Sequence, residues 1–432
     1  MKSPLIFNAF VLNSLTHLNP GQWKNPDNHC AGFMTPDYWK KLASTLEDAL
    51  FDGVFFADVL GLHTQKDDES EYCMSRGIQF PVHDPAPAVA LMASVTRNLC
   101  FGMTSSVFAD TPYLFTRKMS TLDHLTRGRM AWNIVTSYLP SAMQAMGFSA
   151  PLNHKERYLY AEEYVSLCME MWAAAPRMNI IPDDTFFSSA KKVRFEGDYI
   201  KFSGYGLSAY SPQGNPVLYQ AGASDTGLAF AAKNAECVFL AGKSVENTND
   251  LMSGIVRKFS ELKRPRTSYR IIPQVTFITA ESKKLAQQKY EHMVHFADIK
   301  GAEILASAWL GIDLTDQDPL RPLASFQSEA IQSFAEQFTA SSHSKCPETV
   351  GELIRRAAVG GLGCVMVGSP SELADKIVTL QQNGADGFNL PSIVNSGTYE
   401  DFIGYLIPEL KNRGVYKTEY SEGTYREKIF GA

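Results

Sequence analysis

Residues 123–172 read DHLTRGRMAWNIVTSYLPSAMQAMGFSAPLNHKERYLYAEEYVSLCMEMW, and this stretch decides which fold the sequence predicts. Residues 130–136 alternate β-forming residues with small ones, a pattern typical of a buried strand. The pattern breaks at Ser137 and Pro140, so the strand is expected to end there. Asn133 belongs to the last residues of this strand, and polar side chains are therefore expected at its carboxyl end.

A helix is expected after a short loop. Asn153 stands three residues before Glu156, which is the N-cap and N3 spacing of a capping box, so the helix should begin at His154. His154 and Tyr158 then lie on one face of its first turns, because residues four apart are neighbours on a helix. Together with Asn133 they could converge on a polar ligand at one end of a sheet.

The composition is that of an ordinary globular protein. Of the 432 residues, 45% are hydrophobic and 20% are charged, and 40 Lys and Arg against 46 Asp and Glu give a net charge of −6. No basic run or basic aromatic stripe is present, so nucleic acid is not expected as a partner.

Cysteine use and the amino terminus indicate a cytoplasmic protein. The seven cysteines are scattered without a CxxC pair, which favours a reducing compartment over a disulfide framework or a zinc ribbon. Asn8 and Asn13 interrupt the first apolar run, so it is expected to be a strand and not a signal peptide. No apolar run approaches the roughly 20 residues of a membrane helix.

β-rich apolar segments alternate with helical segments along the whole chain. This alternation favours a parallel sheet, and eight such units predict an α/β fold of the (β/α)₈ TIM-barrel class. The expected strands are residues 5–12, 54–58, 99–107, 130–136, 217–221, 237–241, 270–279 and 387–391.

Three polar or irregular segments exceed a minimal barrel. We expect residues 61–84, 173–216 and 300–346 to be insertions that form loops over the catalytic face, because barrels of this kind carry function on their loops. No repeat or linker divides the chain, so residues 1–432 are expected to form a single domain.

Two strand ends carry candidate functional groups. The sequence VLYQAGASDTG (217–227) runs from a strand through small residues into a helix, which could cradle a phosphate or form a plain connection. Asp58 ends another strand, where barrel enzymes place functional groups, although it could also be a loop carboxylate. His63 is expected to face solvent.

Other glycine and histidine patterns carry no function. The segment GGLGCVMVG (360–368) lacks the Lys-Ser/Thr ending of a P-loop, and Ser369 with Glu372 predicts a capping box for a helix through Gln382. No Gly-x-Gly-x-x-Gly follows a strand, so a built-in nicotinamide site is not indicated. The nine histidines show no metal-binding spacing, His292 and His295 included, and no metal is expected.

Four separated segments resemble one known family. The sequence is similar to flavin-dependent monooxygenases of the bacterial luciferase superfamily, in the branch with the nitrilotriacetate and dibenzothiophene sulfone monooxygenases. The similarity runs from about residue 7 to residue 425. The matching segments are STLDHLTRGRMAWNIVTS (120–137), HKERYLYAEEY (154–164), LYQAGASDTG (218–227) and ADGFNLPSIVNSGTYEDFIGYLIPELKNRG (385–414).

The resemblance implies a set of FMN-binding residues. It places Asp58 beside the flavin ring, a non-proline cis peptide at Ser105–Ser106 behind it, and Asn133 where its amide steers oxygen chemistry. His154, Tyr158 and Ser224 would contact the phosphate or ribityl chain, and Asp225, where several relatives have Pro, would point away. The implied site residues are Asp58, Ser106, Asn133, His154, Tyr158 and Ser224.

The resemblance further implies a two-component FMN-dependent monooxygenase. Reduced FMN would come from a separate NAD(P)H:flavin reductase, O₂ would be the co-substrate, and a small organic molecule would undergo C–S or C–N cleavage or hydroxylation. The chain would be a homo-oligomer, a dimer or a tetramer. The alternatives are a flavin-degrading or deazaflavin-dependent oxidoreductase on the same barrel, and a flavin-binding protein without turnover. Aromatic residues of the insertions, including Phe186, Phe187, Tyr205, Tyr210, Trp309 and Phe326, suggest an apolar or planar substrate.

Overall fold

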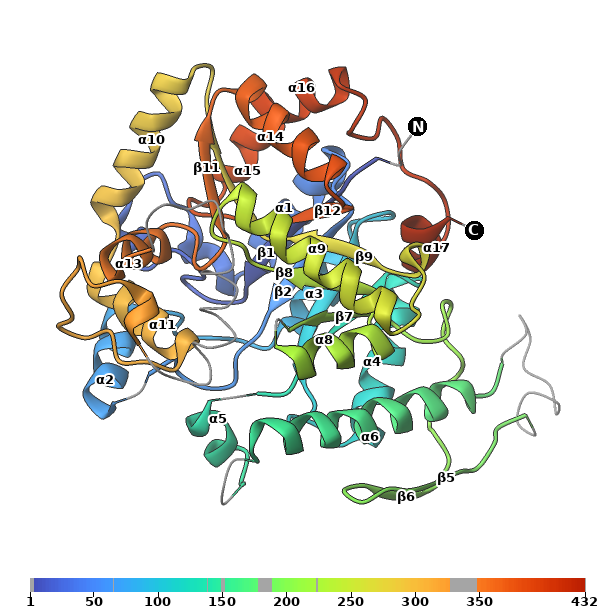
Figure 1. Cartoon of the computed structure of the whole chain (residues 1–432). Helices are drawn as coiled ribbons and strands as arrows, with labels where there is room; N and C mark the ends of the chain where they lie inside the picture. The colour runs from blue at the N-terminus through green and yellow to red at the C-terminus, as the bar shows by residue number, and fades with distance from the viewer. Residues whose placement is uncertain are drawn as a thin grey trace.

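Parallel strands form the centre of the molecule and helices surround them (Figure 1). The computed structural model describes residues 4–64, 66–137, 139–148, 152–177, 189–222, 224–326 and 348–431. Eight strands make one sheet in the order β12-β1-β2-β3-β4-β7-β8-β9. They are β1 (Ile6–Leu12), β2 (Gly53–Ala57), β3 (Cys100–Ser106), β4 (Met130–Val135), β7 (Val217–Ala221), β8 (Cys237–Leu240), β9 (Arg270–Pro273) and β12 (Gly387–Pro391).

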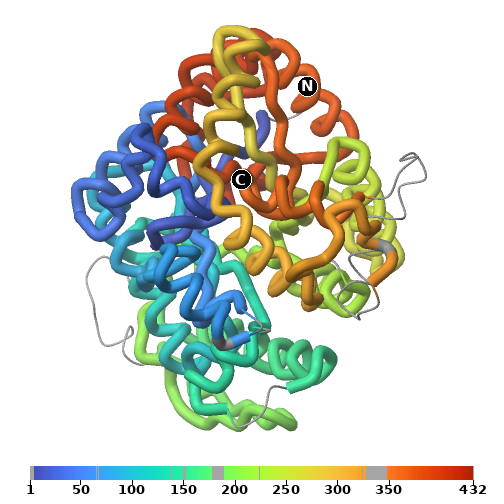
Figure 2. The backbone as a smooth tube through the Cα atoms, turned by 90° about the vertical axis from the view of Figure 1, so that its left-hand side faces the viewer, coloured from blue at the N-terminus to red at the C-terminus, as the bar shows by residue number. Residues whose placement is uncertain are grey.

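The sheet curls until its two edges meet. The backbone N–H of Asp386 donates to the carbonyl of Ile271 at 2.9 Å, and Gln274 forms a parallel bridge with Asn389. Strand β1 pairs with both β12 and β2, so the first and last parts of the chain lie side by side, as the blue and red tubes of Figure 2 show. The predicted (β/α)₈ barrel is confirmed.

The predicted strand at 270–279 is in fact two strands. Its second half, β10 (Val275–Thr279), leaves the barrel sheet after Gln274 and pairs with β11 (Cys364–Gly368). Strand β11 was not expected, because the glycines before it resemble a loop. Gly360 and Gly361 do have positive φ angles of 126° and 71°, and the strand begins directly after that turn.

Helices cover the outside of the barrel. The predicted capping boxes are confirmed: Asn153 caps α6 at His154, and Ser369 caps the helix that ends at Gln382. The longer helices are α1 (Pro36–Asp48), α2 (Asp67–Arg76), α3 (Pro85–Ala93), α4 (Pro112–Thr126), α6 (His154–Ala173), α8 (Asp225–Asn234), α9 (Val245–Glu261), α10 (Lys283–Phe296), α11 (Ile299–Leu310), α13 (Val350–Ala358) and α14 (Pro370–Gln382). The shorter ones are α5 (Pro140–Ala145), α15 (Gly397–Asp401), α16 (Ile407–Asn412) and α17 (Tyr425–Phe430).

Strand alternation separates two apolar layers. On β4, Trp132 points outward and packs against Phe115 of α4, with ring centroids 4.4 Å apart. Ala131 points into the barrel, where it belongs to the same buried cluster as Phe55 and Tyr219. Period-two alternation thus places helix contacts on one face and the barrel interior on the other.

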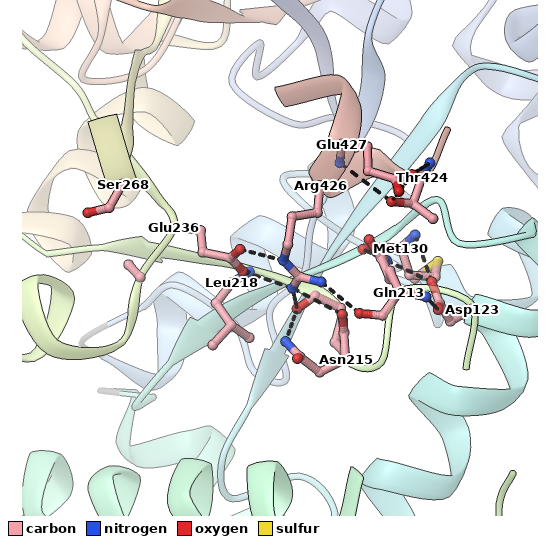
Figure 3. Close-up of polar contacts among 12 residues, drawn as sticks. Asp123, Met130, Gln213, Asn215, Leu218, Glu236, Ser268, Thr424, Arg426 and Glu427 are labelled. Carbon is pink, nitrogen blue, oxygen red and sulfur yellow. Dashed lines mark hydrogen bonds and ion pairs between the residues drawn. The ribbon is translucent and has the colours of Figure 1, made fainter. Parts of the chain in front are cut away.

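Helix α17 packs against the amino end of the barrel, and Figure 3 shows the polar contacts of its Arg426. Tyr425 and Tyr219 join their hydroxyls at 2.7 Å. Arg426 donates through Nε to Glu236 at 2.6 Å and through Nη1 to the carbonyl of Gln213 at 2.7 Å. Since ligands of such barrels bind at the other end, these contacts stabilise the fold and leave the carboxyl end for function.

The three expected insertions contain structure of their own. Residues 61–84 include α2, and residues 173–216 include the antiparallel pair β5 (Val193–Glu196) and β6 (Lys201–Gly204). The third begins within α11, which lies against α2: the Tyr72 hydroxyl donates to Asp298, the N-cap of α11, at 2.8 Å. Phe186, Phe187 and residues 327–346 lie outside the described residues.

Six cysteines within the described ranges are buried and free. Those ranges hold no group of three or more His, Cys, Asp or Glu side chains suited to a metal ion. Searching the same ranges for a helix with the length and apolarity to cross a membrane gives none.

Candidate active site

A cavity of about 960 Å³, the main cavity, opens at the carboxyl ends of β2, β4 and β7. This volume is near the upper end of the roughly 300–1,000 Å³ that small-molecule sites span. Its described lining is Asp58, Val59, Leu60, His63, Ser106, Ile134, Val135, Thr136, Ser137, Leu139, Ala142, Asn153, His154, Arg157, Tyr158, Gln220, Ala221, Gly222, Ser224, Phe230, Ala308, Trp309 and Gly311.

Five of the six expected site residues line the main cavity, namely Asp58, Ser106, His154, Tyr158 and Ser224. The sixth, Asn133, is buried inside the barrel and is not part of the lining. Its Nδ2 donates to Thr104 Oγ1 at 3.0 Å, while its Oδ1 has no partner. The structure therefore brings five residues that are as far apart in sequence as Asp58 and Ser224 around one cavity, with Asn133 beneath it.

One end of the main cavity is formed by the first turns of α6 and α8. Ser224 is the N-cap of α8 and accepts from the Gly227 N–H at 3.1 Å, and its hydroxyl lies 3.5 Å from His154 Nε2. A side chain at Gly227 would meet the Tyr158 hydroxyl, since an added Cβ would lie 2.9 Å from it. Burial raises the pKa of Tyr158, so this hydroxyl keeps its proton and can donate. A helix N-terminus with two hydroxyls suits an anion.

Asp225 does point away from this end. Its side chain is 95% exposed and its Oδ1 lies 3.7 Å from Lys258 Nζ of α9. The carboxylate therefore does not compete with an anion at Ser224.

Arg157 is a site residue that the sequence analysis missed. Among the described residues of the lining it is the only arginine or lysine. Burial lowers its pKa, its Nε has no hydrogen-bond partner, and Nη1 donates to the Leu152 carbonyl at 3.2 Å. The ion pairs of the described chain do not include it. Its place three residues after His154, on the same helix face, was the available signal.

His63 lies on the far wall, and the expectation that it faces solvent is wrong. Its Nδ1 lies 2.8 Å from Gln79 Oε1, and Gln79 Nε2 donates to the His17 carbonyl at 2.8 Å. Because that carbonyl can only accept, Gln79 must turn its oxygen to His63, which fixes the proton on Nδ1. Burial lowers the pKa of His63 to about 4, so the ring is neutral with Nε2 as its acceptor nitrogen.

Trp309 of α11 completes this far wall. Its ring lies edge-on to His63, with centroids 6.1 Å apart, and Leu60, Leu139 and Ala308 line the same space. The far wall is therefore mainly apolar, whereas the end at Arg157 is polar and cationic.

The expected cis peptide at Ser105–Ser106 is wrong. Both residues continue the regular ladder of β3, paired with Ile134 and Val135 of β4, and the Ser106 hydroxyl accepts from Ser137 at 2.7 Å. The cis bonds of the described chain lie at Phe80–Pro81 and at the non-proline pair Asn395–Ser396.

Comparison with known proteins agrees with this fold. The family model described as luciferase-like monooxygenase matches residues 10–387. Dimethyl-sulfide monooxygenase of Hyphomicrobium sulfonivorans is 36% identical over 100% of this chain and 91% of its own length. A crystal structure from that organism has a TM-score of 0.90 at 35% identity, covering 100% of this chain and 93% of its own.

Two further relatives are similar over the whole chain. Long-chain alkane monooxygenase of Geobacillus thermodenitrificans is 35% identical over 100% of this chain and 95% of its own. The crystal structure of a riboflavin lyase with modified FMN and riboflavin has 31% identity and a TM-score of 0.88, over 100% of this chain and 96% of its own. Relatives also include the dibenzothiophene-sulfone and nitrilotriacetate monooxygenases, at 29% and 26% identity.

The fold is that of a (β/α)₈ barrel enzyme, with a cavity at the carboxyl ends of the strands. The chain belongs to the luciferase-like monooxygenase family. It is a flavin-dependent monooxygenase, and the family expected from the sequence is confirmed.

Proposed function

We propose that the protein binds FMN in the main cavity and uses reduced FMN and O₂ to oxygenate a small, neutral, apolar molecule. The observation that carries the proposal is Arg157, a half-buried cation that faces the cavity without an anionic partner in the described chain. A guanidinium removed from water needs an anion, and the phosphate of FMN is one.

The residues at this end fit a phosphate. Arg157 supplies the positive charge, Ser224 and Tyr158 supply hydroxyls, and the first turn of α8 supplies backbone N–H groups. His154 lies beside Ser224 and can donate a further hydrogen bond. Four kinds of donor on two helices form an anion site that an apolar substrate would not need.

Two buried acceptors fit the ring system of a flavin. Asn133 Oδ1 and Gln220 Oε1 have no hydrogen-bond partner, and both residues sit at the ends of neighbouring strands. When bound, reduced FMN supplies two electrons and reacts with O₂, so that one oxygen atom enters the substrate and the other leaves as water. Gln220, which lines the main cavity, would orient the ring, with Asn133 beneath it, and the apolar far wall would exclude water from the substrate.

The far wall defines the substrate class. It carries Leu60, Leu139, Ala308 and Trp309, and within the described lining it has no cation. A carboxylate-rich substrate would lack a counter-charge there, whereas a thioether or hydrocarbon would lose little on leaving water. Two similar enzymes are named for dimethyl sulfide and long-chain alkanes, which supports the same class.

We also propose that a separate reductase supplies the reduced FMN and that the chain forms a homo-oligomer. The sequence has no dinucleotide-binding glycine motif, and one relative is named component A of its monooxygenase.

The test supplies FMN, a flavin reductase, NADH and ¹⁸O₂ with thioether, alkane and aminocarboxylate substrates in parallel. We expect ¹⁸O in the product of a thioether or an alkane and none in the aminocarboxylates. Oxygen incorporation into aminocarboxylates alone would overturn the proposed substrate class. Reoxidation of reduced FMN with hydrogen peroxide as the sole oxygen product, whichever of the three substrate classes is added, would overturn the oxygenase assignment.

A second function is favoured by one observation, the similarity to a riboflavin lyase at a TM-score of 0.88. In that case a second flavin would occupy the far end of the main cavity and would be the substrate. Mass spectrometry of the flavin pool after turnover separates the two: intact flavin supports the first function, and a cleaved ribityl chain supports the second.

A further inference from the structure

A second cavity lies beside the main one. This outer chamber has a volume of about 580 Å³ and is lined by residues of the β2 and β3 ends, of the 79–85 segment and of α4. The two cavities share three lining residues, Asp58, Val59 and Leu60. Asp58 is the one ionisable residue among the three, so a single carboxyl group borders both spaces.

Asp58 has no counter-ion of its own. It takes part in no ion pair between described residues, and its Oδ1 accepts from the Val59 N–H at 2.9 Å. Lys118 of α4, which lines the outer chamber, is engaged with Asp110 at 2.5 Å. Asp84, the N-cap of α3, adds a negative charge on the same side.

The surroundings of Asp58 hold it between its two protonation states. Burial, and then the charge of Asp84, raise its pKa to about 7, while Lys118 opposes them. The other ionisable groups at the main cavity are His63, whose pKa is lowered, and His154, Arg157 and Tyr158 at its cationic end. In the outer chamber they are His83 and Asp110, beside Asp84 and Lys118. A carboxyl group of this kind can both give and take a proton near neutral pH.

We propose that Asp58 carries protons between the outer chamber and the main cavity during the oxygenation reaction. This role rests on the proposed function, because the main cavity is where O₂ would be reduced. Asp58 in its acid form gives one proton to the oxygen atom that leaves as water. The carboxylate then takes a proton from water in the outer chamber. Reduced FMN would give up two protons on oxidation: one would enter the new water together with the proton from Asp58, and the other would leave to solvent and replace the proton taken from the outer chamber.

The first test measures the carboxyl group without flavin. Infrared spectra of the flavin-free protein between pH 5 and 9 should show one carboxylic acid band that titrates near 7 and is absent in Asp58→Asn. Asp84→Asn keeps a good helix cap but removes the charge, so the midpoint should fall; Lys118→Met should raise it. Shifts of roughly 0.3–1 pH unit are expected, less than those of a directly paired charge.

Matched controls separate this effect from general charge effects. Asp48→Asn, at the exposed end of α1 and outside both cavities, changes the net charge equally and should leave the midpoint unchanged. The proposal would be overturned if the Asp58 carboxyl group stays ionised over the whole pH range, so that its acid band never appears. It would also be overturned if Asp84→Asn and Lys118→Met move the titration midpoint in the same direction. Both variants keep the test valid if Asp58→Asn fails to fold.

The second test follows reoxidation of enzyme-bound reduced FMN by O₂. Its rate should follow the infrared midpoint and move with it in Asp84→Asn and Lys118→Met, while Asp58→Asn should lose this pH dependence. A protein that does not bind FMN at all would contradict the proposed function. Bound FMN whose reoxidation is equally pH-dependent in Asp58→Asn would contradict proton transfer by Asp58 alone.

Discussion

Replacement of Arg157 by methionine should weaken FMN binding by roughly 10- to 100-fold. Arg157 is the one arginine or lysine of the described cavity lining, and its buried Nε has no partner. A hydrogen bond to a charged group contributes about 1.5–3 kcal/mol, and about 1.4 kcal/mol is a factor of ten in affinity. Methionine keeps the length and the helix propensity of the side chain, so the change removes the charge and little else.

The assay compares FMN with riboflavin, which has the same ring and ribityl chain but no phosphate. Fluorescence titration should show the loss for FMN and nearly equal riboflavin affinities for wild type and variant. Lys155→Met is the matched control, because Lys155 is exposed on the same helix turn and is absent from the cavity lining. It should bind both ligands as the wild type does.

Thermal unfolding of the flavin-free variant adds an independent check. The loss of the hydrogen bond to the Leu152 carbonyl and the removal of a desolvated charge act in opposite directions, so stability should change by no more than about 1 kcal/mol. An equal loss of affinity for FMN and riboflavin would refute the assignment of Arg157 to the phosphate.

Three further results are expected. Arg426→Ala should lower the free energy of unfolding, measured by urea titration, by about 2–3 kcal/mol, because the charged hydrogen bonds of Arg426 to Glu236 are half-buried. Lys233→Ala, which breaks an exposed ion pair, should lower it by at most about 1 kcal/mol. Acid should destabilise the fold, because burial lowers the pKa of His17 to about 3 and of His63 to about 4. The unfolded chain then binds protons at a higher pH than the folded chain, so the free energy of unfolding should fall as the pH drops from 6.5 to 4, by about 1.4 kcal/mol for each ring at pH 5.5. A urea midpoint that does not depend on pH would contradict this. Trp309→Ala should leave FMN affinity unchanged but raise the KM of an apolar substrate and the yield of hydrogen peroxide; an unaltered KM would remove Trp309 from the substrate wall.

Local sequence patterns were sufficient for most of the barrel. The capping box at Asn153 and the alternation on β4 act over a few residues, so they can be read directly from the chain. The break at Gln274 could not be, because residues 270–279 are one continuous β-rich run. The strand divides where β10 begins to pair with β11, some 90 residues further along the chain, and a local pattern does not contain that pairing.

The gathering of candidate residues around one cavity was predictable where one motif carried them. His154, Tyr158 and Ser224 lie in segments that resemble the family, and the structure brings them together. The environment of His63 depends on Gln79 and on Trp309, which is 246 positions away, so its burial is a tertiary effect that its own neighbours in sequence do not report. Arg157 was within reach, but a charged residue on a helix is usually solvated.

The two ends of the main cavity are built from different parts of the chain. Arg157 and Ser224 stand at helices that follow barrel strands, whereas His63 and Trp309 come from the segments that we expected to be insertions. An exposed ion pair between Lys66 and Asp313 also joins these two segments. Changes at distant positions combine almost independently. Substitutions confined to residues 59–64 and 304–312, in evolution or in a mutant library, could therefore change the substrate that the enzyme accepts while the residues proposed to hold the flavin stay the same.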